Sequence, residues 1–388
     1  MTSSARIFWP FVACLAWLGV LATAAEPAAI GMHMEPLRTK KLSHYRGHEQ
    51  ETLRERMVRF QSGERHYGIS YKAGYREDRP GKAFPLEGYI GMPSPTACNW
   101  YHSGFLDIRV NGRSIGATAL SSFTIVERGK RGIADLVWHA EQASVRVRFV
   151  MLPGTDALFC EITIETPKPT DRVELALRCY PSFFTSHHKR VGARLIQTPE
   201  AQIKEGEKSD LPMKGNEWAL YSDGVFDVDR GEGRGPCALL LPSCTRTVHF
   251  APGGYSVETR IECTPGTQTV RMAFWDWKGL TNAQASAKMP DEARVARAVL
   301  DTVDFTPAAL ADADLEAMRE DCRQALASPE AKKMLAKKLE SIQAWLENMP
   351  EKRSADASIR AQEGFLRAAD EFEQFRWEIK LVKLISDL

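Results

Sequence analysis

Three β-strands in immediate succession are predicted between residues 132 and 166 of the 388-residue sequence. Apolar side chains occupy alternate positions in this stretch, at Ile133, Leu136, Trp138, Val145, Val147, Phe149, Leu158, Cys160, Ile162 and Ile164. A period of two indicates a sheet with one buried face. The breaks at 141–142 and 153–155 are too short for a crossover helix, so we expect neighbouring strands to be antiparallel.

Similar strand-like runs recur from residue 65 to residue 278, about fourteen in all. Short strands at this spacing predict a mainly β chain with a large antiparallel β-sandwich. From Gly279 onward the apolar residues take helical spacing, which predicts a C-terminal α-helical segment. The expected helices span 290–303, begin again at Pro307, and span 329–348 and 358–385, the last two as an antiparallel hairpin. Both faces of the run 270–277 are apolar, so we expect the helical segment to cover one of them.

Residues 1–25 have the pattern of a secretory signal peptide, with Arg6, an apolar stretch at 7–21 and small residues at 22–25. We therefore expect a secreted or periplasmic protein, and the lack of any Asn-x-Ser/Thr sequon fits a bacterial exported chain. The alternative is lipidation at Cys14. No other stretch is apolar for long enough to cross a bilayer, so we expect no transmembrane span in the mature chain.

The expected organisation is a signal peptide at 1–25, an N-terminal arm at 26–60, a β-sandwich domain at 61–279 and the helical segment at 280–388. The 51 basic and 50 acidic residues nearly cancel, so no net field attracts nucleic acid and we expect no such partner. The motifs GxSxG and HExxH and the P-loop are absent, and whether the chain is an enzyme stays open.

Removal of Cys14 with the signal peptide leaves Cys98, Cys160, Cys179, Cys237, Cys244, Cys263 and Cys322. Because this number is odd, at least one cysteine must stay unpaired within a monomer. Cys160, Cys179 and Cys263 fall on apolar strand faces and Cys322 on an apolar helix stripe, where buried thiols are expected. Cys160 with Cys179 is the disulfide to test first, because these residues lie on successive strands. No Cys/His spacing indicates zinc.

A long connection rich in Pro and Gly, residues 77–103, ends in Asn99, Trp100, Tyr101 and His102. Long loops in compact domains are often functional. Sugars are commonly bound by aromatic rings that stack on the pyranose and by polar groups that bind its hydroxyls, so these four residues are the predicted ligand-binding site. The alternative is a loop held in place by its own tryptophan.

A second irregular loop, residues 182–190, carries His187, His188 and Arg190. A histidine there could transfer protons and the arginine could hold an acidic group, so these are the candidate catalytic residues. The alternative is a solvated basic loop.

Three acidic residues, Asp227, Asp229 and Glu232, surround a glycine-rich turn. Carboxylates suit calcium, so this turn is a candidate calcium site, and no other cofactor is expected. The spacing is not that of an EF-hand, and the alternative is a polar hairpin turn.

The run of strands between Arg65 and Lys278, followed by helices, resembles the β-supersandwich of galactose-mutarotase-like proteins. The resemblance is one of architecture and covers residues 60–280. It implies that histidines and a carboxylate on one concave sheet perform acid and base chemistry at the anomeric carbon of a sugar. The histidines that could take this part are His139, His187, His188 and His249.

The leading interpretation is a secreted carbohydrate-binding or carbohydrate-associated β-sandwich protein, with a glycan or small saccharide as its partner. A second is a glycan-acting enzyme of epimerase, mutarotase or lyase type, with a histidine of the 182–190 loop as acid/base and Arg190 holding an acidic sugar. A third is a non-catalytic structural protein that self-associates through an apolar stripe of the C-terminal helices, at Phe365, Phe372 and Ile379.

Overall fold

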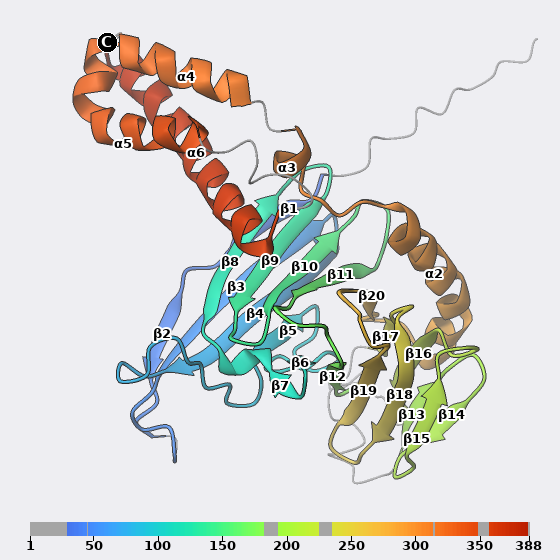
Figure 1. Ribbon diagram of the computed structural model, residues 1–388. Helices are drawn as coiled ribbons and strands as arrows, with labels where there is room; N and C mark the ends of the chain where they lie inside the picture. The colour runs from blue at the N-terminus through green and yellow to red at the C-terminus, as the bar shows by residue number, and fades with distance from the viewer. Residues whose placement is uncertain are drawn as a thin grey trace, which may run out of the picture.

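The computed structural model describes residues 29–44, 46–181, 193–224, 235–312, 315–347 and 357–386. In this part of the chain two antiparallel β-sheets stack face to face and helices follow them (Figure 1). The predicted fold class, a large antiparallel β-sandwich followed by a C-terminal helical segment, is confirmed. Strands give way to helices between Asp276 and Asn282.

One sheet has eleven strands in the order β1-β3-β4-β5-β6-β12-β19-β18-β15, with β2 beside β3 and β7 beside β6. Its strands are β1 (Gly31–Met34), β2 (Arg38–Lys41), β3 (Thr52–Ser62), β4 (Arg65–Tyr75), β5 (Ile90–Ser94), β6 (Leu106–Val110), β7 (Arg113–Ser114), β12 (Val173–Cys179), β15 (Ser209–Pro212), β18 (Thr245–Pro252) and β19 (Val257–Cys263). A short 3-10 helix, η1 (Ile115–Ala117), follows β7.

The other sheet has nine strands in the order β14-β13-β16-β17-β20-β11-β10-β9-β8. Its strands are β8 (Leu120–Glu127), β9 (Gly132–His139), β10 (Ser144–Met151), β11 (Leu158–Glu165), β13 (Arg194–Gln197), β14 (Gln202–Lys204), β16 (Trp218–Asp223), β17 (Cys237–Leu240) and β20 (Thr269–Asp276). The three strands predicted between 132 and 166 are β9, β10 and β11, and they pair antiparallel as expected.

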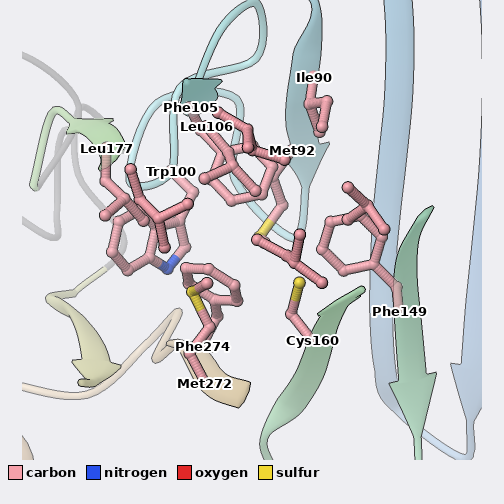
Figure 2. Packing of buried hydrophobic residues seen from close by; sticks show 14 of the residues in the cluster. Ile90, Met92, Trp100, Phe105, Leu106, Phe149, Cys160, Leu177, Met272 and Phe274 are labelled. Atoms are coloured by element: carbon pink, nitrogen blue, oxygen red, sulfur yellow. The ribbon is translucent and has the colours of Figure 1, made fainter. Parts of the chain in front are cut away.

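The main core lies between the two sheets, where the apolar side chains of alternate strand positions meet (Figure 2). Phe149 of β10 and Cys160 of β11 are register partners, and both side chains point into this core. Trp100 is packed within it, edge to face against Tyr221 and Phe274 at ring-centroid distances of 5.6 and 5.1 Å. Aromatic pairs of this geometry add to the free energy gained by burial.

The outer face of the nine-stranded sheet is covered by α2 (Asn282–Thr302). Trp275 and Trp277 turn toward this helix and share an apolar cluster with its Met289. The expectation that the helical segment covers a second apolar face is therefore confirmed for α2.

The start of α2 differs from the predicted 290. Thr281 forms a capping box with Gln284, which satisfies the free N–H groups of the first turn, and Pro290 lies inside the helix. Proline is common in the first turn of helices, which is why the sequence favours a start at Pro290.

The remaining helices are α3 (Ala308–Asp312), α4 (Leu315–Ala327), α5 (Pro329–Glu347) and α6 (Ile359–Ser386). Figure 1 shows α4, α5 and α6 grouped beyond one end of the sandwich. The expected helical pair is present, since α5 and α6 pack together and α4 packs on α5. Phe365 and Phe372 of α6 are fully buried in this group. No helix in the described ranges has both the length and the hydropathy needed to cross a bilayer.

Residues 26–60 were expected to form an arm, and from Gly31 on they instead supply β1, β2 and most of β3 to the eleven-stranded sheet. β3 pairs with β4 along its whole length. In these residues of β3 only Val58 and Phe60 are fully buried, which is too few apolar positions to reveal a period of two.

The cysteines from Cys98 to Cys322 are free thiols. The expected buried thiols at Cys160, Cys179, Cys263 and Cys322 are confirmed, each at most 2% exposed. Cys160 on β11 and Cys179 on β12 belong to different sheets, and no S–S bond joins them.

A buried ion pair fastens the chain that follows α2 to the nine-stranded sheet. The side chains of Arg148 on β10 and Asp135 on β9 are 2% and 3% exposed. Two parallel hydrogen bonds of 2.8 and 2.7 Å join them, and a third from Arg148 reaches the Phe305 carbonyl at 2.9 Å.

We predict that Asp135→Asn lowers the free energy of unfolding by about 3–5 kcal/mol, because it removes the carboxylate that is hydrogen-bonded to the buried Arg148 charge. Urea unfolding followed by circular dichroism measures this loss. The matched control is Glu378→Gln, which breaks an ion pair with Lys338 whose side chains are 42% and 44% exposed. It should cost at most about 1 kcal/mol. Equal losses in the two variants would contradict this account.

Candidate functional site

A groove runs over the outer face of the eleven-stranded sheet at β6, β12 and β19, and we call it the sheet groove. Side chains alternate between the two faces of a strand, so in β12 the side chains of Glu174, Ala176 and Arg178 point outward and the residues between them are buried. Ala176 is the register partner of Asp107 on β6 and of Arg260 on β19. Its methyl group leaves space between these longer side chains, and the groove encloses about 480 Å³.

Residues 85–89 form one wall of the sheet groove. Tyr89 anchors this wall, since its hydroxyl accepts a hydrogen bond of 2.7 Å from the Ile108 N–H on β6. A Cβ at Gly88 would lie only 2.1 Å from the Cα of Gly104, so the wall can approach the sheet this closely because residue 88 is glycine. The helices pack on the other sheet, α2 against β16, β17 and β20 and α6 against β8, β9 and β10.

Charged side chains line the sheet groove in pairs. Asp107 accepts hydrogen bonds from Arg109 Nε at 3.0 Å and from Ser114 Oγ at 2.6 Å. Glu258 lies between two arginines, 3.8 Å from Arg178 and 3.6 Å from Arg260. All of these charged groups are partly exposed. They can therefore offer both donors and acceptors to a polar ligand.

A row of tyrosine rings adjoins one end of the groove. Tyr180 packs on Tyr101 at a centroid distance of 4.7 Å and on Tyr255 at 4.8 Å. Tyr101 donates to Glu87 at 3.0 Å, and the Arg178 guanidinium lies 5.9 Å from the Tyr101 ring centre, so the row contacts two groove residues. Burial raises the pKa of Tyr101 to about 12, which keeps its hydroxyl a donor. The outermost ring, Tyr255, is 48% exposed.

The predicted loop 99–102 mostly faces the core. Asn99 and Trp100 are 0% and 1% exposed. Trp100 Nε1 donates to the Trp275 carbonyl at 2.9 Å, so this ring joins the loop to β20. Tyr101 reaches the groove through its hydroxyl and His102 is partly exposed. A role of these four residues in ligand binding stays a prediction, and their positions favour it for Tyr101 and His102.

Two predicted sites fall outside the described residues. They are the candidate catalytic residues His187, His188 and Arg190 and the candidate calcium ligands Asp227, Asp229 and Glu232. Across the ranges that are described, no group of three or more His, Cys, Asp or Glu side chains could hold a metal ion.

The other two histidines named for acid and base chemistry lie apart. His139 is held between Ser144 Oγ at 2.9 Å and Glu363 of α6 at 2.8 Å, so it joins the helices to the nine-stranded sheet. His249 of β18 pairs with Asp210 of β15 at 2.7 Å. It is the register partner of the groove residue Arg260, and so it lies beside the sheet groove.

Sequence reasoning missed the charged lining of the sheet groove. Its signal was a charged residue at alternate positions of three strands, such as Arg109, Arg178 and Arg260. The three strands are far apart in the sequence, and their pairing β6-β12-β19 creates the site. Nothing local predicts that pairing.

No protein-family model matches the chain, and no curated protein matches it either. Several solved structures are similar. An α-N-acetylgalactosaminidase from Bifidobacterium bifidum has 11% identity and a TM-score of 0.38 over 75% of this chain and 42% of its own. A TPR-domain containing protein from Parabacteroides distasonis has 10% identity and a TM-score of 0.35 over 91% and 79% of the two chains.

An Escherichia coli K12 protein described as an aldose 1-epimerase is also similar, with 11% identity and a TM-score of 0.27 over 64% of this chain and all of its own. This chain spans less than half the length of the α-N-acetylgalactosaminidase. Some of these structural neighbours are thus carbohydrate-active enzymes at a large distance, and the likeness concerns the fold alone. The two antiparallel sheets followed by helices agree with the supersandwich architecture that the sequence predicts.

Asp276 anchors the loop 94–102 at the end of β20. Its carboxylate accepts hydrogen bonds from Thr96 Oγ1 at 2.6 Å and from Asn99 Nδ2 at 3.0 Å. Burial raises the pKa of Asp276 to about 6 from 3.8, while these hydrogen bonds oppose the rise. The folded chain therefore binds this proton more tightly than the unfolded chain does.

We predict that the free energy of unfolding of the wild type, measured relative to Asp276→Asn, falls as the pH rises from about 4 to about 6, by at most about 3 kcal/mol. The reason is that the folded chain must give up a proton in this window that the unfolded chain has already lost. Urea unfolding at a series of pH values measures the difference. The control is Asp291→Asn, because the Asp291 side chain is 85% exposed. The difference in free energy of unfolding between the wild type and this variant should not change with pH. A flat difference for Asp276→Asn would contradict the prediction.

Proposed function

We propose that this protein is a secreted or periplasmic carbohydrate-binding protein, and that the sheet groove binds a glycan or small saccharide. The observation that carries the proposal is a groove lined by guanidinium donors and carboxylate acceptors, with a row of tyrosine rings adjoining one end. The signal-peptide pattern of residues 1–25 supports export.

The chemistry of a sugar fits these groups. Its hydroxyls can donate to Asp107 and Glu258 and accept from Arg178 and Arg260, since each of these side chains is partly exposed. The apolar face of a pyranose can stack on the exposed ring of Tyr255. Positive and negative groups alternate in the groove, which suits a neutral polyhydroxylated ligand as well as an acidic one.

We predict that Arg178→Ala and Tyr255→Ala each weaken saccharide binding about tenfold or more, through loss of a charged hydrogen bond or of a stacking surface. A glycan array identifies the ligand, and isothermal titration calorimetry compares the variants. The matched control is Arg294→Ala on α2, whose side chain is 74% exposed and should leave affinity unchanged. The proposal fails if the wild type binds no glycan while the array controls behave, or if Arg294→Ala loses as much affinity.

A glycan-acting enzyme is the second candidate, and the pair of His249 with Asp210 supports it. A histidine oriented by a carboxylate is a suitable general base, and Arg260 is its register partner in the groove. The pair is partly exposed, so a sugar held in the groove can reach it.

If the protein is an enzyme, we expect His249→Ala to abolish turnover of the bound saccharide while affinity changes less than threefold. Proton NMR of the anomeric signals measures turnover, and calorimetry measures affinity. His139→Ala, which alters a histidine at the helix junction, is the control and should retain turnover. An unchanged spectrum of the saccharide with the wild-type chain would refute the enzyme candidate and leave a binding protein.

Self-association through the C-terminal helices ranks third. The apolar stripe expected to pair two copies is covered in the monomer, with Phe365 and Phe372 at 0% and Ile379 at 7% exposed. α4 and α5 contribute to the same apolar cluster. The proposal of self-association therefore has no support from this stripe.

A further inference from the structure

Two thiols lie in contact where β18 begins and β19 ends. Cys244 is in the turn before β18 and Cys263 is the last residue of β19, and their sulfur atoms are 3.6 Å apart and share a hydrogen bond. Cys263 is 2% exposed, whereas Cys244 is partly exposed. The pair therefore has one partly exposed thiol and one buried thiol.

The backbone fixes the two residues next to each other. The Thr264 N–H donates to the Cys244 carbonyl at 2.8 Å, and Thr245 is the register partner of Cys263. Thr245 is itself held by a hydrogen bond of 3.0 Å from its N–H to the Pro242 carbonyl. A disulfide needs the sulfurs about 1.5 Å closer than this.

Cys244 is the thiol suited to react first. Its exposure gives an external oxidant access, and the hydrogen bond with Cys263 holds the pKa of Cys244 below its usual value. The thiolate is the nucleophile in thiol–disulfide exchange, so a lower pKa favours attack by Cys244. The same hydrogen bond raises the pKa of Cys263, and Cys263 is buried, so Cys263 is not the thiol that reacts first with an external oxidant.

A competing pair of thiols lies deeper in the sandwich. Cys179 and Cys237 interact with each other and are 2% and 0% exposed. Burial raises the pKa of Cys237 well above its usual value. A buried thiol of raised pKa reacts slowly with an external oxidant, so both access and acidity favour Cys244 with Cys263.

We propose that Cys244 and Cys263 are a site of disulfide formation, oxidised by an external disulfide such as glutathione disulfide. The Cys244 thiolate attacks one sulfur of the oxidant, which forms a mixed disulfide and releases one glutathione thiolate. Cys263 then loses its proton and attacks the Cys244 sulfur, which forms the Cys244–Cys263 bond and releases the second glutathione. Two cysteine thiols lose two electrons and two protons, and one glutathione disulfide becomes two glutathione thiols.

The bond would join the start of β18 to the end of β19. It would therefore close the β18–β19 hairpin into a loop in which Cys244 and Cys263 are 19 positions apart. A cross-link of this kind restricts the unfolded chain more than the folded one. The oxidised chain should therefore unfold at a Tm about 5 °C higher than the reduced chain.

The test incubates the folded full chain with glutathione disulfide, blocks free thiols by alkylation and maps tryptic peptides by mass spectrometry. We expect peptide 235–246 linked to peptide 261–271, with the loss of two hydrogens. Because peptide 235–246 also contains Cys237, the matched control is Cys237→Ser, which should retain the link. Cys244→Ser and Cys263→Ser should each abolish the link and the rise in Tm.

Complete alkylation of Cys244 and Cys263 after oxidation of the wild type would overturn the proposal. A link that is lost in Cys237→Ser and kept in Cys244→Ser would also overturn it, in favour of Cys237. Circular dichroism checks that each variant is folded. If the buried Cys263→Ser change prevents folding, Cys244→Ser at the partly exposed position still decides the outcome.

Discussion

Burial of one apolar face of each sheet against the other is the constraint on which this structure depends. It fixes which side chains of every strand point inward, and the period of two then sends the intervening residues outward. In β12 this places Glu174 and Arg178 on an open surface, whereas in β20 it places Trp275 on an outer face that needs cover. α2 supplies that cover, whereas the outer face of the eleven-stranded sheet at β6, β12 and β19 carries the sheet groove.

The loop 94–102 connects this core to the candidate site. Asn99 and Trp100 bind it to β20 through Asp276 and the Trp275 carbonyl, and the adjacent Tyr101 reaches Glu87 in the groove wall. The loop thus serves both the packing of the sandwich and the edge of the sheet groove. The tryptophan that looked suited to a sugar holds the position of the tyrosine beside it.

The sequence alone predicted the sandwich because local alternation in strands such as β9, β10 and β11 is strong. It did not predict β3 as part of the sheet, since only Val58 and Phe60 of that strand reach the core before its last residue. It could not predict the sheet groove, because Asp107 and Arg260 meet only through the long-range pairing of β12 with β6 and β19. Trp100 lies in an irregular loop, where side chains do not alternate regularly. The sequence therefore could not predict whether this ring points inward or outward.

The central claim is that a saccharide binds on the outer face of β6, β12 and β19. Hydrogen–deuterium exchange of the full chain, with and without a saturating saccharide chosen from the glycan array, tests it most directly. The account predicts slower exchange at residues 85–89 and in the hairpin turn that carries Tyr255, with α5 and α6 unchanged. Protection confined to the helices or to the nine-stranded sheet would contradict it.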